Sequence, residues 1–160
     1  MKYGQMSKIL FQETQKFNQW WLYLIVIGTA VLLIVTFAAA AWESPSDYNM
    51  IGAIVSMLAG IAMIVLIWVL KLKTTITEEK IRIHYFPFIK KEWKWSELKS
   101  AKVFDYGFVG GWGIRIWTGY GTIYNVRGSK GLHIKTNDKE YVIGTQKEEE
   151  MRSSIAHLLK

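Results

Sequence analysis

The sequence contains no cysteine, and this absence excludes disulfide bonds and thiolate metal sites. Its three histidines, at positions 84, 133 and 157, lie in separate segments and lack the short spacing of a metal-binding motif. Cysteine and histidine hold most transition metals, and the chain has no local cluster of either residue type. We expect no metal centre and no cofactor.

Charged residues are missing from two long stretches, residues 20–42 and 50–70. A helix needs about 20 apolar residues to cross a hydrocarbon core of roughly 30 Å. A chain of 160 residues cannot enclose two helices that are apolar on every face. The first stretch is also longer than the apolar part of a signal peptide. The sequence therefore predicts a transmembrane helical hairpin over residues 20–70, with a short external loop at 43–49.

The basic residues beside the two apolar stretches predict the orientation of the hairpin. Lys2, Lys8 and Lys16 precede the first stretch, and Lys71 and Lys73 follow the second. The charged side chains of the connecting loop are Glu43 and Asp47, and both are acidic. Because lysine and arginine near span ends stay on the cytoplasmic side, we expect a multi-pass protein of the cell membrane with both termini cytoplasmic.

The N-terminal residues 1–19 are predicted to form a cytoplasmic interfacial segment. Met6, Leu10 and Phe17 would lie near one face of a helix, although Glu13 interrupts that face. A helix with one apolar face can lie flat among the lipid headgroups. We therefore expect a short helix of this kind before the first span.

The second apolar stretch carries small residues at four-residue spacing. Gly52, Ser56 and Gly60 would share one face of the helix and allow another helix to approach closely. The approaching helix is either the first span of the same chain or a second copy of the protein. The sequence leaves both alternatives open.

From residue 71 onward the hydrophobic period changes to two, which is typical of β-strands. The short segments are rich in β-branched and aromatic residues and are separated by turn-forming residues. We expect strands at residues 72–77, 80–86, 91–95, 100–108, 112–117, 122–126, 131–136 and 139–144. The sequence predicts an α+β membrane protein in which residues 71–160 form a cytoplasmic antiparallel barrel or sandwich.

The last segment predicts an amphipathic helix. Thr145 and Glu148 have the spacing of a capping box, and three glutamates occupy the first turn. One side of this helix would carry the apolar side chains of Met151, Ile155, Leu158 and Leu159. We expect this helix to close one end of the strand domain.

The segments "TTITEEKIRIHYFPF", "WKWSELKSAKV", "GGWGIR", "YNVRGSKGLHI" and "YVIGTQKEEEM" resemble the bacterial PH-like (pleckstrin-homology-like) domains found in small membrane proteins. The preceding hairpin, with "FNQWW" at its entry, is similar to the usual arrangement of such proteins. The resemblance covers essentially the whole chain and implies a PH-like barrel plugged by its C-terminal helix. It implies a fold and no particular activity, because none of these segments is a catalytic signature.

Glycines are concentrated between residues 108 and 131, as in a phosphate-binding loop. Neither the dinucleotide fingerprint nor the P-loop pattern is completed there, and no helix is expected to follow. We interpret these glycines as turn positions between antiparallel strands. Trp112, Ile114 and Ile116 are predicted to supply core, with Arg115 and Arg127 facing outward.

Catalysis is not expected. Asp105 and Glu97 are the obvious candidates for a carboxylate pair, but the sequence places neither beside a base or a nucleophile. We assign no catalytic residue, and we interpret the protein as a non-enzyme.

The positive charge of the chain lies in its polar domain. Residues 71–160 carry 17 basic and 10 acidic side chains, which accounts for the whole formal net charge of +7. Possible contacts to anionic headgroups or to a partner are Lys90, Lys91, Lys94, Arg115, Arg127 and Lys130. The same charge also serves solubility and the positive-inside rule.

We interpret the chain as a membrane-anchored PH-like module that mediates protein–protein interaction or assembly at the cytoplasmic membrane face. The partner would be another membrane or cytoplasmic protein, or a second copy of the chain. The alternative is anionic-lipid headgroup binding or membrane sensing through a basic rim. Nucleic acid is not an expected partner, because the bilayer already occupies one side of the domain.

Overall fold

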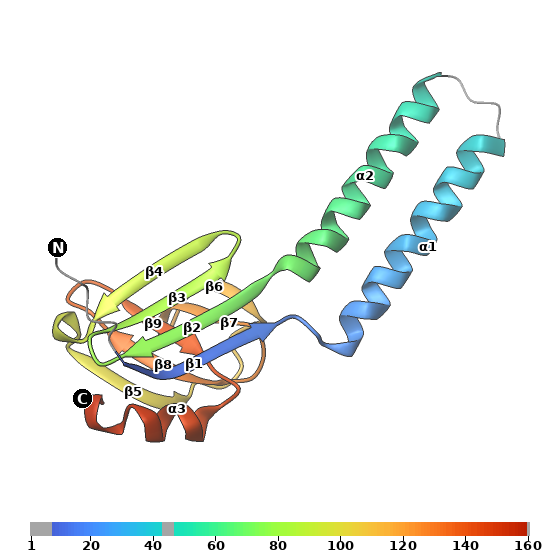
Figure 1. Cartoon of the computed structure of the whole chain (residues 1–160). Helices are drawn as coiled ribbons and strands as arrows, with labels where there is room; N and C mark the ends of the chain where they lie inside the picture. The colour runs from blue at the N-terminus through green and yellow to red at the C-terminus, as the bar shows by residue number, and fades with distance from the viewer. Residues whose placement is uncertain (1–7, 43–46, 160) are drawn as a thin grey trace, which may run out of the picture. The chain divides into compact units, whose positions relative to one another are not determined.

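The computed structural model describes residues 8–42 and 47–159 and divides the chain into two compact units. Residues Phe17–Leu70 form the helical unit. The residues up to Lys16 and the residues from Lys71 onward form the strand unit (Figure 1). The helical unit is thus an insertion between two parts of the strand unit.

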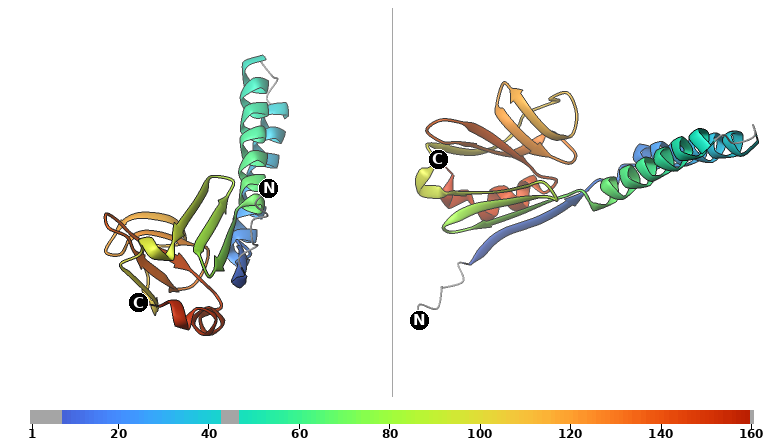
Figure 2. Two further views of the ribbon diagram at one scale, coloured as in Figure 1. Left: turned by 60° about the vertical axis from the view of Figure 1, so that its left-hand side comes forward. Right: turned by 90° about the horizontal axis from the view of Figure 1, so that it is seen from above.

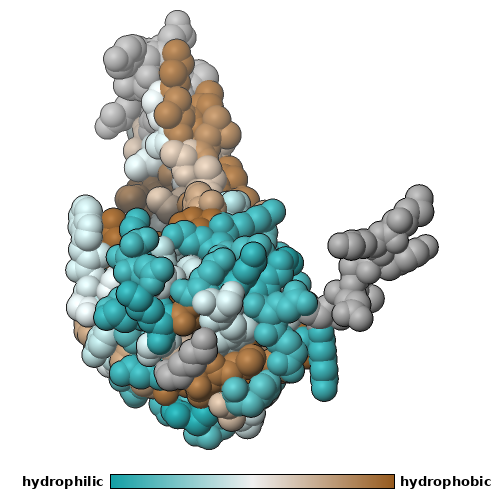
Figure 3. All heavy atoms as spheres, turned by 90° about the vertical axis from the view of Figure 1, so that its left-hand side faces the viewer, coloured by the Kyte–Doolittle hydropathy of each residue, from teal (hydrophilic) through white to brown (hydrophobic). Residues whose placement is uncertain are grey.

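The helical unit consists of α1 (Trp20–Trp42) and α2 (Asp47–Val69). Each helix has 23 residues, which corresponds to a length of about 35 Å. Most of their described side chains are exposed; Leu32, for example, is 63% exposed. Apolar residues, brown in Figure 3, form much of the visible helix surface. Both helices are long and apolar enough to cross a membrane, as predicted. Residues 43–46 of the predicted external loop lie outside the described residues.

The small-residue face of α2 meets α1 at one position. A Cβ added at Gly60 would collide with the side chain of Leu33 in α1, whereas a Cβ at Gly52 would meet nothing within 4 Å. The Ser56 hydroxyl donates to the carbonyl of Ala53 in its own helix, at 2.9 Å. Of the predicted packing residues, Gly60 therefore contacts the first helix, and packing through a second copy stays a prediction.

The strand unit contains two sheets, which form separate layers in Figure 2. The first sheet has the order β1-β2-β3-β4 and is antiparallel throughout. Its strands are β1 (Ile9–Lys16), β2 (Lys71–Thr77), β3 (Lys80–Phe86) and β4 (Ile89–Lys94). β1 and β2, which are neighbours in the sheet, flank the helical unit in the sequence.

The second sheet has the order β5-β8-β9-β7-β6. Its strands are β5 (Ser100–Asp105), β6 (Gly113–Thr118), β7 (Gly121–Asn125), β8 (Lys130–Lys135) and β9 (Glu140–Gly144). All eight predicted strands are present, but β7 and β9 are parallel, so the prediction of a purely antiparallel domain was wrong. No strand pairing within residues 8–42 and 47–159 joins the two sheets, so they do not close into a barrel.

The core lies between the inner faces of the two sheets. Residues of alternate strand positions are fully buried, among them Leu72, Ile76, Ile81, Leu132 and Ile143. Direct contacts join the layers; for example, the Tyr85 hydroxyl donates to the carbonyl of Asn125 at 3.4 Å, and the rings of Trp93 and Tyr141 are 4.9 Å apart.

The prediction of an N-terminal interfacial helix was wrong, because Ile9–Lys16 is a strand of the first sheet. Phe11, Glu13 and Gln15 point inward and the residues between them point outward, which is a period of two. The inward positions include two polar side chains, so the apolar alternation that would reveal a strand is masked. The described residues of this segment up to Lys16 therefore belong to the strand unit.

Buried polar contacts tie β1 to the C-terminal part of the chain. The carboxylate of Glu13 accepts hydrogen bonds from the Thr145 hydroxyl at 2.6 Å and from the Gln146 amide at 3.0 Å. The side-chain amide of Gln15 donates to the carbonyl of Gly144 at 2.7 Å. These polar residues join segments about as far apart in the sequence as the chain allows.

The C-terminal helix α3 (Glu148–Ser154) is followed by a short 3-10 turn, Ala156–Leu158. It contacts β1 and β5, an edge strand of each sheet, and buries Met151 and Ile155. The predicted capping box was wrong: Lys147 is the N-cap residue, and no side chain caps the helix. Thr145 lies outside the helix because its hydroxyl binds Glu13 and accepts from the Lys147 amide.

Candidate functional site

The predicted cationic contacts do not form one cluster. Arg127 and Lys130 line a pocket of about 620 Å³ between the β7–β8 turn and the start of α3. Lys90 and Lys91 lie on β4, Lys94 ends that strand, and Arg115 lies on β6. The sequence identified cations that the fold places at separate positions.

The pocket beside α3 is balanced in charge. It is lined by Glu148, Glu149 and Glu150 as well as by basic residues. Glu148 forms ion pairs with Lys130 and with Arg152, and hydrogen bonding to Glu148 raises the pKa of Lys130. A cation that is already paired offers little to an incoming anion, so this pocket is a poor headgroup site.

Lys91 has a local partner as well. Its ammonium lies 4.7 Å from the ring centroid of Tyr141 and 5.9 Å from that of Tyr124. This is cation–π geometry, which holds the ammonium over two rings of the second sheet. Lys91 therefore bridges the two layers and is not directed at a ligand.

The outward face of the first sheet gathers cations that the sequence separates. In the strand register Lys73 lies opposite His84, and His84 lies opposite Lys90. The next row, on the side where the chain joins the helical unit, pairs Lys16 with Lys71. We call Lys16, Lys71, Lys73, His84 and Lys90 the basic surface. Part of it lines a groove of about 500 Å³.

The basic surface carries no compensating acid. Within the part of the chain that the structure describes, no carboxylate lies at ion-pairing distance from its four lysines. The pKa of His84 is lowered, first by partial desolvation and then by the positive charges of Lys90, Lys71 and Lys73. A neighbouring imidazole thus experiences the positive potential of this surface.

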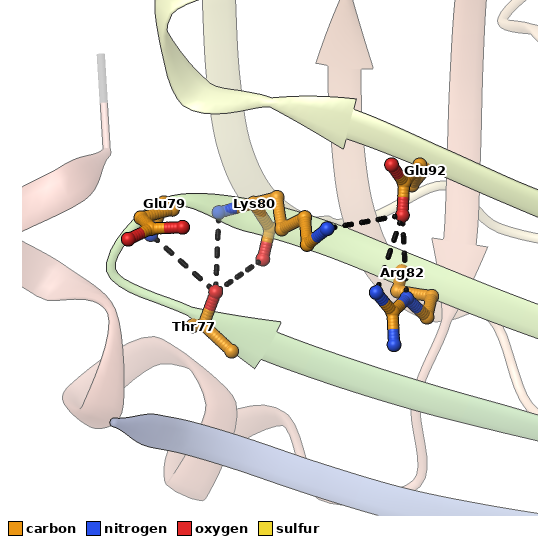
Figure 4. A network of polar contacts seen from close by, with 5 residues as sticks. All are labelled: Thr77, Glu79, Lys80, Arg82 and Glu92. Carbon is orange, nitrogen blue, oxygen red and sulfur yellow. Dashed lines mark hydrogen bonds and ion pairs between the residues drawn. The ribbon is translucent and has the colours of Figure 1, made fainter. Parts of the chain in front are cut away.

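The other half of the same face is partly neutralised, because one carboxylate is shared by two cations. Glu92 accepts hydrogen bonds from Lys80 and from Arg82, each at 3.3 Å (Figure 4). Hydrogen bonding to Lys80 is the main cause of the lowered pKa of Glu92. Beyond it, Thr77 closes the β2–β3 turn by accepting from the amides of Glu79 and Lys80. On the outward face of the first sheet, Lys80 and Arg82 therefore share an acidic partner toward the β2–β3 turn, whereas the lysines at the opposite end have none in the described chain.

Strand β6 departs from its predicted role. Ile116 is 55% exposed and Trp112 37%, so the prediction that they supply core was wrong for both. Ile114 and Arg115 are half-buried, whereas Arg127 is exposed as predicted. Trp112 precedes the strand, and Ile116 lies where β6, an edge strand, has a register shift between Arg115 and Thr118. An extra residue on one strand breaks the alternation from which burial was predicted.

The irregularity in β6 is a β-bulge that presents Trp117. Between the pairs Arg115–Ile123 and Thr118–Gly121, Ile116 and Trp117 together oppose the single residue Thr122. Trp117 has φ of 58° and is 94% exposed. Among the described residues it is the one non-glycine with positive φ. We call Ile116 and Trp117 the β6 bulge.

The glycines before β6 form turns, as predicted. Gly110, for example, has φ of 78°. Just before residues 108–131, Gly107 has φ of 70°, and its amide donates to the Asp105 carboxylate at 2.9 Å. This bond is the main cause of the lowered pKa of Asp105. The turn leads to Phe108, which is 85% exposed, and then to a strand. The phosphate-loop geometry, in which a helix follows the glycines, does not occur here.

No metal site is evident in residues 8–42 and 47–159: no three histidine, aspartate or glutamate side chains lie close enough together to hold an ion. No family model, curated protein or solved structure matches the chain. The function is therefore inferred from two surface features, the β6 bulge and the basic surface.

Proposed function

We propose that the protein is a non-enzymatic module, anchored in the cell membrane by α1 and α2, that binds another polypeptide through the β6 bulge. Both termini and the strand unit lie on the cytoplasmic side in this proposal. The single observation that carries the interaction is the conformation and exposure of Trp117.

Nothing within the fold favours tryptophan at position 117. A bulky residue in the left-handed region costs about 1–2 kcal/mol relative to ordinary backbone conformations. A side chain that is 94% exposed gains almost no burial energy in return. Strained residues of this kind cluster at binding sites, where a partner compensates for the strain. Tryptophan is also among the residues most enriched at the energetic centre of protein interfaces.

The position of the β6 bulge at a sheet edge indicates how a polypeptide would bind. One side of β6 pairs with β7, and the other side has no strand neighbour in the described sheet. An edge strand of this kind can accept an added strand, whose side chains then meet the exposed groups. Ile116 and Phe108 offer further apolar surface nearby in the sequence. The partner is therefore expected to contribute an extended segment with apolar side chains.

The proposal keeps the PH-like family as its structural interpretation. Two facing sheets, a C-terminal helix on their edges and two apolar helices fit that resemblance. The open sheets and the contribution of β1 depart from a simple barrel formed by residues 71–160. A second copy of the chain is one possible partner, since it has the same apolar edge.

Site-specific photo-crosslinking of the full-length protein in native membranes tests the proposal. A photoreactive amino acid replaces Trp117, and a matched probe replaces Lys102, an exposed residue of the opposite edge strand β5. We expect one discrete protein adduct from position 117 and none of that size from position 102. Trp117→Asn, which tolerates a positive φ, should abolish co-purification of the same partner. Lipid adducts alone, or equal adducts from both positions, would refute the interaction.

A further inference from the structure

Chain connectivity fixes one end of the first sheet beside the membrane insertion. α2 ends at Val69, and β2 begins at Lys71, two residues later. β1 ends at Lys16, which is paired with Lys71, and α1 begins at Trp20. At about 3.5 Å per residue, Lys71 lies at most about 7 Å and Lys16 about 14 Å of chain from a helix end. These bounds follow from the covalent chain and the strand register alone.

The basic surface lies at this end of the sheet. Lys16 and Lys71 occupy the row nearest the helices, and Lys73, His84 and Lys90 occupy the row two residues further on. Two residues along a strand span about 7 Å, and neighbouring strands are about 4.8 Å apart. All four lysines are therefore within about two Debye lengths of the helix ends at ordinary ionic strength. The paired residues Arg82 and Glu92 lie on the side away from the helix ends.

An exposed aromatic turn lies at the same end. Phe86 is paired with Lys71, whose ammonium is 5.1 Å from the centroid of its ring. The β3–β4 turn that follows projects beyond this row and carries Phe88, which is 62% exposed. Continuing the register, Phe88 lies level with Phe86 and Lys71, and Pro87 lies level with Leu70, the residue that joins α2 to β2. An aromatic side chain flanked by lysines is well suited to the region between headgroups and acyl chains.

We propose that this end of the first sheet docks on an anionic bilayer surface, with Phe88 inserted at the interface and Lys16, Lys71, Lys73 and Lys90 bound to lipid phosphates. The inference extends to a second surface and rests on the membrane anchorage in the proposed function, but not on the β6 bulge. Charge complementarity selects the lipid: two rows of lysines with no acidic partner in the described chain, close in the chain to the helix ends, match the anionic cytoplasmic leaflet.

Docking leaves the rest of the strand unit accessible. Lys91 and Lys94 are not required, because the first is held over two tyrosine rings and the second lies at the opposite end of β4. Arg127 and Lys130 are likewise outside the docked surface. The proposal thus selects Lys90 from the contacts predicted by sequence. It adds Phe88 and the three lysines Lys16, Lys71 and Lys73, which the sequence placed beside the two spans.

The absence of cysteine makes spin labelling straightforward, since each introduced cysteine is the single labelling site. Full-length protein would be labelled after Phe88→Cys, or after Glu79→Cys in the β2–β3 turn, and reconstituted in nanodiscs. A third label, after Leu32→Cys in α1, reports whether the helices span the bilayer. The nanodiscs contain phosphatidylcholine alone or with phosphatidylglycerol. The depth of each label is measured from its accessibility to oxygen and to a water-soluble nickel complex.

We expect the label at position 88 to report bilayer depth in anionic nanodiscs and the label at position 79 to remain in water. Each lysine near the surface contributes about fivefold to binding. The double variant Lys73→Gln/Lys90→Gln should therefore lower the docked-to-undocked ratio by about 25-fold. The control Lys99→Gln/Lys102→Gln, which removes the same charge elsewhere, should leave it unchanged. Raising the salt from 0.1 to 1 M shortens the Debye length from about 10 to about 3 Å and should also release the label.

Three results would overturn the inference. The first is a label at position 88 that remains in water in anionic nanodiscs. The second is a label depth that is the same with and without anionic lipid. Immobilisation of this label without a depth signal would indicate a protein partner instead of lipid. If the label at position 32 is in water, the anchorage itself fails; if it is at depth while position 88 is not, only the docking fails.

Discussion

The hydrogen bonds of Glu13 should be a main source of stability for the strand unit. Its side chain is buried, with 7% exposed, and its carboxylate accepts from the Thr145 hydroxyl and the Gln146 amide. Hydrogen bonds to a charged group contribute about 1.5–3 kcal/mol each, and donors left unpaired add a desolvation cost. We expect Glu13→Ala to lower the free energy of unfolding by about 3–5 kcal/mol. Glu13→Gln, which keeps one acceptor oxygen, should cost about 1–2 kcal/mol.

Native-state hydrogen exchange of the full-length protein measures this loss at the amides of β1 and β2. The control is Glu97→Ala, which removes an exposed carboxylate of the same kind and should change stability by no more than about 0.5 kcal/mol. The expected order of protection is control, Glu13→Gln, then Glu13→Ala. Equal protection in Glu13→Ala and Glu97→Ala would refute the assignment of β1 as an integral strand.

Three further predictions concern stability and packing. Trp117→Asn removes an exposed side chain from a left-handed position, so we expect the free energy of unfolding to stay the same or rise by up to about 1 kcal/mol in denaturant titrations; a loss above about 1 kcal/mol would show that Trp117 is packed. Burial raises the pKa of Tyr85 to about 12, so the stability that its neutral form provides is present below the unfolded pKa of about 10 and is lost as the pH rises to 12. That loss should be about 2–3 kcal/mol and should be absent from Tyr85→Phe in unfolding titrations between these pH values. Gly60→Leu would drive a side chain into Leu33 and should weaken the α1–α2 contact by about 1–3 kcal/mol. Spin-label distance measurements should show the two helices further apart in this variant. Gly52→Leu, with open space at its Cβ, should leave the distance nearly unchanged.

Elements with one simple periodicity could be predicted from the sequence. The absence of charge in residues 20–42 and 50–70 was sufficient for both helices, and α1 has the predicted bounds. The strands of residues 72–144 followed from alternation and turn residues. The sheet order and the parallel β7–β9 pair could not be predicted, because alternation indicates which face is buried and does not identify the neighbouring strand.

Misses occurred where polar residues are buried or apolar residues exposed. Glu13 and Gln15 point into the protein and so conceal β1. Thr145 has the spacing of a helix cap, but its hydroxyl binds a carboxylate from the other end of the chain. Ile116 was expected in the core because strict alternation along β6 would bury it. The bulge that turns it outward has no signal in the composition, although the sequence does show two tryptophans nearby, Trp112 and Trp117.

The candidate surfaces, too, were predictable from the sequence only in part. The excess of basic residues was evident, but the sequence could not show which of them are neutralised. Lys130 is paired with Glu148, whereas Lys73 and Lys90 flank His84 across three strands without a partner acid in the described chain. Register brings these side chains together from positions that no local motif connects.

The insertion of the helical unit between β1 and β2 also bears on biosynthesis. β1 emerges first, but its partner β2 is translated only after both helices. In the anchored protein, the two strands can meet only if the second helix has returned the chain to the side it started from. A hairpin that inserts once and fails to return would leave β1 and β2 on opposite sides of the bilayer. With the proposed anchorage, completion of the first sheet is therefore conditional on correct membrane topology, and a misinserted chain would expose unpaired strands for proteolysis.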